Sequence, residues 1–270
     1  MKNHKLSKLL LASVISSLTV PTFAQQLEEV VVTASKRAEN LQDIPQAVTA
    51  FSSERLVELG IVETSDLMGA IPNIQVTSAY GRTQPNFSIR GISVANEFSA
   101  ATASPVGVYV DEVYQSFRAS HGQQLFDLES VEVLRGPQGT LYGRNTTGGA
   151  VNVNTIKPSL DEGTSGFLNV RLGNYSYADF TGAVEATIIP DVLGVRLSGA
   201  VSEADGYVDN TLLGTDHPQT SSTAGRLSFL WRPSEKTDIH AKVYWAENDP
   251  RQDIAFGVGY LAGGANGTGV

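Results

Sequence analysis

The chain has 270 residues, of which 17% are charged and 41% are hydrophobic, and it contains no cysteine. This length allows one or two domains with a sizeable core, and the lack of cysteine excludes disulfides, thiolate metal sites and cysteine nucleophiles. The formal net charge of −9 argues against nucleic acid as a partner, because a nucleic-acid-binding protein would carry a basic face.

The first 24 residues have the layout of a secretory signal peptide. Three lysines form a basic start, Leu9–Val20 is almost wholly apolar or small, and Thr22–Ala24 places a small residue at the expected cleavage point. The apolar run is too short to cross a bilayer as a helix, and the sequence has no later apolar run that is long enough. We therefore expect an exported protein in which any membrane crossing is made by β-strands.

The region from residue 25 to about residue 158 mixes short helix and strand signals. Ser52 or Ser53 can cap a helix that stops at Gly60, and Ser65 can start a second short helix. The mixture predicts a small α+β unit. Its predicted strands are Ile74–Thr77, Phe87–Ile89, Gly107–Val110, Ser130–Leu134 and Ala150–Thr155.

From about Gly163 the pattern changes to strict alternation of apolar and polar residues, as in Leu168, Val170 and Leu172 against Asn169 and Arg171. Such alternation indicates half-buried β-strands. Three later segments alternate in the same way. In the first, Leu193, Val195 and Leu197 lie opposite Arg196 and Ser198; in the second, Leu227, Phe229 and Trp231 lie opposite Arg226, Ser228 and Arg232. In the third, Ile239, Ala241, Val243 and Trp245 lie opposite His240, Lys242 and Tyr244.

Alternation alone fits either a soluble sandwich or a membrane β-barrel, but three details favour the barrel. The strands have about ten residues, which suits a tilted membrane strand. Short connections at Pro190–Leu193 and Pro233–Thr237 alternate with a long one at Ala204–Ser222, and Trp231 and Trp245 fall near strand ends. We count about five strands, whereas a closed barrel starts at about eight. We therefore expect the N-terminal portion of something longer; a small soluble sheet is the alternative.

Two segments need explanation beyond the fold. Glu28–Ala34 is short, extended and β-branched, and suits either addition to another protein's sheet or a first strand of the domain. Val131–Asn154 places five glycines between two strands, which suggests a phosphate loop. It contains neither a Walker motif nor the Gly-x-Gly-x-x-Gly fingerprint, so we reject nucleotide binding and expect no cofactor.

With these motifs in view, the chain resembles the TonB-dependent outer-membrane receptors. Glu28–Ala34 looks like the TonB box, Ser88–Gly91 looks like the Ile-Arg-Gly motif, and Val106–Glu112 matches the Tyr-Val-Asp segment. The long run Glu129–Asn154 matches the Leu-Arg-Gly-Pro, Leu-Tyr-Gly and Gly-Gly-x-Val-Asn series of the family nearly throughout. The chain ends at Gly267–Val270 without the usual aromatic assembly signal, which puts transport by this polypeptide alone in doubt.

The resemblance implies an α+β plug domain followed by the first antiparallel strands of a transmembrane β-barrel that is incomplete in this chain. It implies a signal peptide at 1–24, the TonB box and a flexible tether at 25–43, the plug at 44–158 and about five barrel strands at 159–270. The box comprises Glu28, Glu29, Val30, Val31, Val32 and Thr33.

The resemblance also implies roles for single residues. Arg90 and Arg135 would pair with glutamates of the barrel wall; the alternative is that each is a solvated arginine on a turn. Tyr80 and Arg82 would face the ligand, or they are plain loop residues. Gly91, Gly136, Gly148 and Gly149 are expected to allow tight backbone turns.

By resemblance, the function is energised uptake of a scarce nutrient, most often a ferric siderophore, across the bacterial outer membrane, with the plug facing the periplasm. The partners would be TonB of the inner-membrane energy-transducing complex, the nutrient and outer-membrane lipid. Vitamin B12, haem or an oligosaccharide are alternative cargoes, and a truncated plug-bearing interaction or binding protein is the alternative function. An enzyme is rejected, because the sequence has no nucleophile elbow and no zinc-site spacing.

Overall fold

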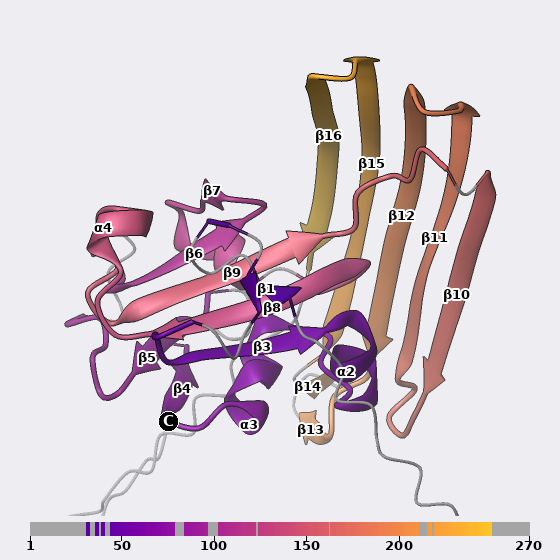
Figure 1. Ribbon diagram of the computed structural model, residues 1–270. Coiled ribbons are helices and arrows are strands. Elements are labelled where there is room, and N and C mark those ends of the chain that lie inside the picture. The colour runs from indigo at the N-terminus through magenta and orange to yellow at the C-terminus, as the bar shows by residue number, and fades with distance from the viewer. Residues whose placement is uncertain are drawn as a thin grey trace, which may run out of the picture.

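The computed structural model describes residues 31–32, 36–37, 39–40, 44–78, 84–96, 102–122, 124–161, 163–210, 215–217 and 219–249. Figure 1 shows a mixed N-terminal domain beside a tall antiparallel sheet. In this described part, no helix is long and apolar enough to cross a membrane.

The N-terminal domain is built on a five-stranded sheet with the order β3-β8-β9-β6-β7. β6 and β9 pair in parallel, and the other neighbours are antiparallel. The strands are β3 (Val48–Ser52), β6 (Val106–Val110), β7 (Val113–Tyr114), β8 (Leu128–Arg135) and β9 (Gly149–Thr155). A separate hairpin of β4 (Ile74–Thr77) and β5 (Asn86–Ile89) lies beside this sheet, so all five predicted strands are confirmed to within two residues at each end.

Short helices pack against both faces of this sheet. They are α2 (Ser53–Glu58), η2 (Thr64–Asp66), α3 (Leu67–Ala70), η4 (Arg118–Gly122) and α4 (Gly139–Tyr142). Helices α2 and α3 lie on the face of Val131 and Val133, and α4 lies on the face of Leu134. The hydroxyl of Ser52 accepts a hydrogen bond from the Arg55 amide at 3.4 Å and caps α2, and Gly60 follows its end with φ of 67°. Both predicted helices are therefore present, although the second begins as a 3-10 turn capped by Glu63 and Asp66.

The main core of the domain lies between the sheet and the helices α2 and α3. Phe87, Ile89, Leu67, Val131 and Val133 are completely buried there. Burial of such side chains stabilises the domain by about 1.5–3 kcal/mol each before the cost of ordering them. The domain therefore has an apolar core of its own, separate from its contact with the tall sheet.

The second part is an antiparallel meander with the order β10-β11-β12-β15-β16. Its strands are β10 (Thr164–Leu172), β11 (Ala178–Ile189), β12 (Leu193–Ala204), β15 (Thr220–Ser234) and β16 (Thr237–Asn248). Tight turns join β11 to β12 and β15 to β16 at one end. At the other end a small hairpin, β13 (Val208–Asn210) with β14 (Thr215–His217), lies within the long connection (Figure 1).

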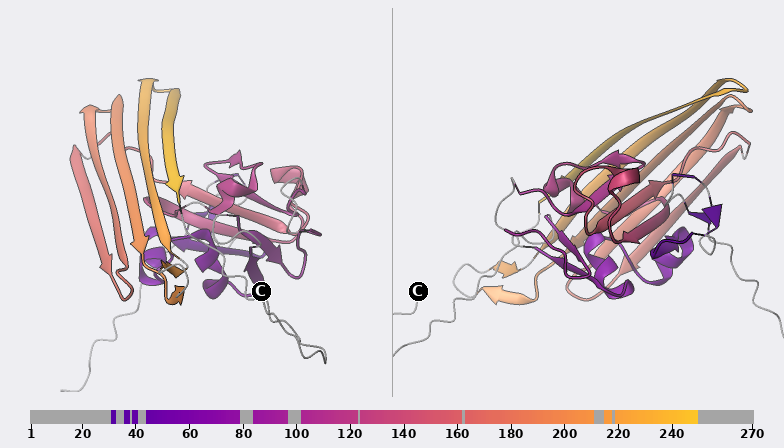
Figure 2. Two further views of the ribbon diagram at one scale, coloured as in Figure 1. Left: turned by 180° about the vertical axis from the view of Figure 1, so that it is seen from behind. Right: turned by 60° about the vertical axis from the view of Figure 1, so that its left-hand side comes forward.

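The tall sheet is polar where it faces the N-terminal domain and apolar where it is exposed. Leu168, Leu197 and Val243 are 71%, 54% and 68% exposed, whereas Arg196 and Arg226 are 7% and 5% exposed. A soluble sandwich would bury the apolar face instead, so this inversion indicates a sheet with hydrocarbon outside and polar contacts inside. Figure 2 shows the N-terminal domain lying against one face of the sheet, with the other face uncovered.

Candidate functional site

The contact between the two parts is centred on one carboxylate. Asp127 stands directly before β8, in a turn where its φ of 52° aims the side chain at the tall sheet. Its carboxylate is completely buried. Arg196 of β12 reaches it with two nitrogens, Nη2 at 2.5 Å from Oδ1 and Nε at 3.1 Å from Oδ2. This forked geometry is the strongest form of a carboxylate–guanidinium pair.

A second arginine and a second carboxylate complete the group. Arg226 of β15 donates from Nη2 to Asp127 Oδ2 at 2.8 Å and to the Asp127 carbonyl at 2.7 Å, and its guanidinium lies 4.9 Å from the centre of the Phe126 ring. Glu185 of β11 accepts from Arg196 Nη1 at 3.0 Å. We call Asp127, Glu185, Arg196 and Arg226 the Asp127 cluster; it contains two positive and two negative charges and joins three strands of the tall sheet to the N-terminal domain.

The electrostatics of the Asp127 cluster favour the ionised carboxylate. Burial alone would raise the pKa of Asp127, but the Arg196 hydrogen bonds and the charges of Arg226 and Arg196 outweigh it and hold the pKa below its ordinary value. The group therefore stays charged at any physiological pH. Its contribution depends on both partners remaining in place, since a buried ion without its partner is costly.

A second ion pair joins the same surfaces at the turn between β6 and β7. Asp111, with φ of 45°, accepts from the Thr155 amide at 2.8 Å and from the Thr155 hydroxyl. Lys242 of β16 forms an ion pair with the same Asp111 carboxylate. Thus two carboxylates of the N-terminal domain meet cations that project from the inner face of the tall sheet.

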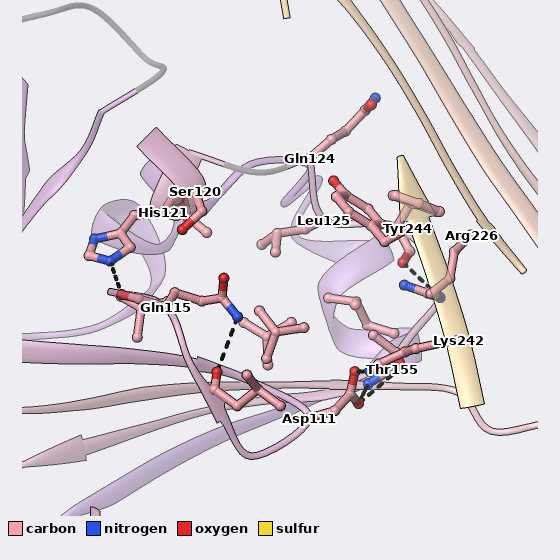
Figure 3. A pocket seen from close by; sticks show the side chains of 17 residues that line it. Asp111, Gln115, Ser120, His121, Gln124, Leu125, Thr155, Arg226, Lys242 and Tyr244 are labelled. Carbon is pink, nitrogen blue, oxygen red and sulfur yellow. Dashed lines mark hydrogen bonds and ion pairs between the residues drawn. The ribbon is translucent and has the colours of Figure 1, made fainter. Parts of the chain in front are cut away.

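Between these two contacts lies a cavity of about 270 Å³, which Figure 3 shows from close by. Its lining includes Arg226, Lys242 and Tyr244 from the sheet, and His121 and Gln124 from the N-terminal domain. His121 Nε2 bonds to the Gln115 carbonyl at 2.9 Å, and burial lowers the pKa of its imidazole. Within the described ranges, no group of three or more His, Cys, Asp or Glu side chains could hold a metal ion.

The predicted TonB box is described only at Val31–Val32. These two residues form strand β1, which pairs antiparallel with β2 (Glu39–Asn40) in the predicted tether. Glu28, Glu29, Val30 and Thr33 lie outside the described residues, as do the signal peptide and the ligand-facing candidates Tyr80 and Arg82. The roles assigned to these residues stay predictions.

The two Arg-Gly motifs lie close together. Arg90 is exposed and its Nη1 is 3.6 Å from the point that a Cβ on Gly136 would occupy, while the Arg135 amide donates to the Ala47 carbonyl. Within the described part of the chain, no carboxylate forms an ion pair with either arginine. Their pairing with barrel glutamates stays a prediction.

The four glycines of the motifs play different parts. Gly91 and Gly136 have φ of 78° and 107°, in the region that glycine adopts most easily. Gly149 has φ of 155°, and a Cβ there would approach the Leu134 carbonyl oxygen to 2.3 Å. Gly148 has no left-handed backbone; a Cβ there would press on Ile92 and Val106, so close packing rather than a turn requires a small residue.

Sequence reasoning missed the Asp127 cluster. The alternation did place Arg196 and Arg226 on the inward face, which is where the structure has them. Nothing in the local sequence singles out Asp127 as their partner, since it lies 69 residues before Arg196. An inward arginine on a wall strand does, however, require a carboxylate opposite it, and that requirement is the signal that could have led to Asp127.

Several known proteins are similar to this chain in sequence. A family model described as the TonB-dependent Receptor Plug Domain matches residues 40–150. The pesticin receptor of Yersinia pestis is 34% identical over 138 residues, which are 51% of this chain and 20% of the receptor. The ferrioxamine B receptor of Salmonella typhimurium is 26% identical over 270 residues, covering 93% of this chain and 36% of the receptor.

The fold agrees with a solved receptor. The crystal structure of the ferric yersiniabactin uptake receptor of Yersinia pestis has a TM-score of 0.68 and 25% identity, over 74% of this chain and 31% of that chain. The chain therefore spans between 20% and 36% of the length of these relatives.

The relatives are receptors rather than enzymes, which confirms the prediction that this chain is not an enzyme. The N-terminal domain is the plug, and the tall sheet with its exposed apolar face corresponds to barrel strands. The chain is similar to the TonB-dependent receptors of the outer membrane: residues 40–150 match their plug domain, and the five antiparallel strands of the tall sheet correspond to part of the barrel wall.

Proposed function

We propose that this chain takes part in the TonB-dependent uptake of a ferric siderophore. The single observation that carries the proposal is the seating of the plug on the polar inner face of the wall through two buried ion pairs and a third, partly buried one. A plug held in this way closes the space inside the wall strands until work is done on it. The names of the relatives, which include ferrioxamine B and ferric yersiniabactin receptors, support iron chelates as the cargo.

The energy would enter at the predicted TonB box, Glu28–Thr33. Its Val31–Val32 is extended and already pairs with a strand, which supports a segment that can add to the sheet of a partner protein. TonB would bind there and pull. The tether Ser35–Asp43 would carry the force to β3, an edge strand of the plug sheet.

The cargo would first meet loops of the plug and the wall on the outer side. Tyr80 and Arg82 stay our candidates for this contact, because a guanidinium suits an anionic chelate and a phenol ring can stack on an aromatic one. The long connection that carries β13 and β14 would lie on the same outer side, with the tight turns of β11–β12 and β15–β16 on the periplasmic side.

Capture by TonB tests the energy-coupling part of the proposal. The purified receptor should be retained by an immobilised periplasmic domain of TonB, and a variant lacking residues 28–33 should not be. Equal capture of both proteins would reject the box assignment. A substrate panel then tests the cargo: growth of iron-starved cells on ferric siderophores supports the proposal, whereas growth only on haem, or uptake only of vitamin B12 or an oligosaccharide, assigns another cargo. Binding without any uptake would assign a plug-bearing interaction protein.

A further inference from the structure

Three cations gather on the inner face of the wall, next to the plug. In the strand register, Ser228 of β15 lies between Arg196 of β12 and Lys242 of β16, so these two cations flank one position. Arg226 is two residues from Ser228 along β15 and therefore projects from the same face. With strands about 4.8 Å apart, the three Cα atoms lie within about 10 Å of one another. We call Arg196, Arg226 and Lys242 the wall patch.

The plug neutralises the wall patch while it is seated. Asp127 binds Arg196 and Arg226, and Asp111 binds Lys242. The wall supplies one carboxylate of its own, Glu185, which binds Arg196. With the plug in place the group is neutral, and without the two plug carboxylates the wall patch and Glu185 together carry two net positive charges.

We infer that the two plug carboxylates occupy a binding site for an anionic chelate, and that the wall patch takes up such a ligand when the plug moves away. This inference rests on the proposed function only in assuming that the plug moves. A narrow space lined by low-dielectric walls strengthens the field of uncompensated cations and raises the local concentration of anions. The two plug carboxylates therefore hold the positions beside the wall cations that the negative charges of a multiply charged ligand would take.

The cavity shows where the exchange begins. It lies beside both ion pairs, and both Lys242 and Arg226 line it. Figure 3 shows Lys242 of β16 beside Asp111 and Thr155 of the plug, and Arg226 of the neighbouring strand β15 beside Tyr244. The volume of about 270 Å³ is enough for a small polyanion before the plug leaves completely.

If the ion pairs served only as a latch that holds the plug on the wall, the same contacts would be present. The test must therefore distinguish a latch from a binding site. In a latch only the pairing matters, and either side can carry either charge. In a binding site the positive charge must be on the wall. Exchanging the partners, Asp111→Lys with Lys242→Asp, keeps the pair and reverses the charge of the wall.

The first experiment uses sulfate as the probe and needs no transport. Purified full-length receptor in lipid nanodiscs is titrated with sulfate by calorimetry, as wild type and as Asp111→Asn, which uncovers Lys242 but leaves the Asp127 cluster intact. We expect at least tenfold tighter sulfate binding to Asp111→Asn than to wild type, and loss of this gain in Asp111→Asn/Lys242→Gln. Asp111→Ser repeats the test if the amide variant is misfolded. Equal binding by wild type and variant, or binding that survives Lys242→Gln, overturns the inference.

The second experiment measures uptake of an anionic and a neutral ferric chelate by energised cells that produce the exchanged receptor. We expect uptake of the anionic chelate to fall at least tenfold and uptake of the neutral one to stay within twofold of wild type. The control exchanges Arg232 of β15 and Asp238 of β16, an exposed pair near the tight turn between these strands, and should change the uptake of neither chelate. Wild-type uptake of both chelates by the exchanged receptor would show a latch only. If the wild type transports no chelate, the proposed function fails, and the sulfate titration still decides the inference.

Discussion

Asp127 of the plug and Arg196 of the barrel wall form a forked ion pair in which the carboxylate is completely buried and the guanidinium is only 8% exposed. Arg226 approaches the same carboxylate from the next strand. A barrel strand and a plug turn that are far apart in sequence are thus joined by the strongest kind of polar contact. This contact is the main polar attachment between the plug and the described wall strands.

Replacing Asp127 by Asn should loosen the plug. The change leaves Arg196 and Arg226 buried with one carboxylate, Glu185, which contacts Arg196 alone. Breaking a buried ion pair costs about 3–5 kcal/mol. We expect faster cleavage of the plug by protease in intact outer membranes. Asp238→Asn, in an exposed pair, serves as the matched control and should leave the cleavage rate unchanged. Equal resistance of Asp127→Asn and wild type would contradict the role of the cluster in holding the plug on the wall.

Asp127 also makes the stability of the folded protein depend on pH in the acid range. The folded-state pKa of Asp127 lies below its ordinary value of 3.8, so the unfolded chain takes up a proton first as the pH falls. The stability from this group is therefore complete above about pH 5 and is lost as the pH falls through 3.8 and then through the folded-state pKa. Thermal unfolding between pH 3 and pH 6 should show this loss in wild type and a smaller loss in Asp127→Asn.

His121 should make folding stability depend on pH in a second, less acidic range. Burial, aided by the nearby Arg118 charge, lowers the pKa of its imidazole below the ordinary 6.5 despite the hydrogen bond to Gln115. The unfolded chain therefore binds a proton first on acidification, and stability falls below pH 6.5 by up to about 1.4 kcal/mol per pH unit. In His121→Gln, the midpoint temperature of thermal unfolding should change less between pH 6.5 and pH 5 than it does in wild type. Parallel slopes for the two proteins would show that another group is responsible.

Gly149 should tolerate no side chain. A Cβ would lie 2.3 Å from the Leu134 carbonyl oxygen and 2.7 Å from Ile89 Cδ1, so β8 and β9 could not keep their spacing. We expect Gly149→Ala to destabilise the plug by about 1–3 kcal/mol or more, as overpacking does. Gly139→Ala is the control, because nothing lies within 4 Å of its added methyl group. Chemical denaturation of both variants compares them directly.

The exposed apolar face of the wall predicts a lipid contact. Val243 is 68% exposed on β16, and an arginine there should cost about 2–4 kcal/mol in the middle of a bilayer. Val243→Arg should reduce assembly in the outer membrane, measured as the fraction of receptor that runs as a folded band in unheated gels. Met68, 50% exposed on α3 of the plug, provides the comparison, and Met68→Arg should assemble normally. Normal assembly of Val243→Arg would place that face away from lipid.

The sequence predicts the elements well, because their periodicity is local. The alternation at Leu168–Leu172 and Leu193–Ser198 correctly assigns the two faces of the wall, and Ser52 with Gly60 correctly bounds α2. The parallel pairing of β6 with β9 could not be predicted, because about 40 residues of chain separate the two strands and the sequence of neither strand identifies the other as its neighbour. The long connection of Ala204–Ser222 was expected as a loop, and the hairpin inside it was missed.

The site could be predicted only in part, for a related reason. A pattern of inward arginines gives the face of the sheet but not the partner, which the fold brings in from the plug at Asp127. The prediction centred on plug arginines paired with wall glutamates, whereas the described contacts pair plug carboxylates with wall cations. Charge complementarity is a property of two surfaces, and the sequence of either surface alone does not contain it.

Uptake of radiolabelled iron is the decisive measurement for TonB-dependent import through this receptor. Cells that produce the full-length receptor as their sole outer-membrane route for a given ferric siderophore are compared with cells whose receptor lacks residues 28–33, and with cells that lack TonB. We expect accumulation in the first cells and none in the other two, while all three bind the chelate at their surface. Accumulation that continues without residues 28–33 or without TonB would contradict an energised receptor coupled through this segment.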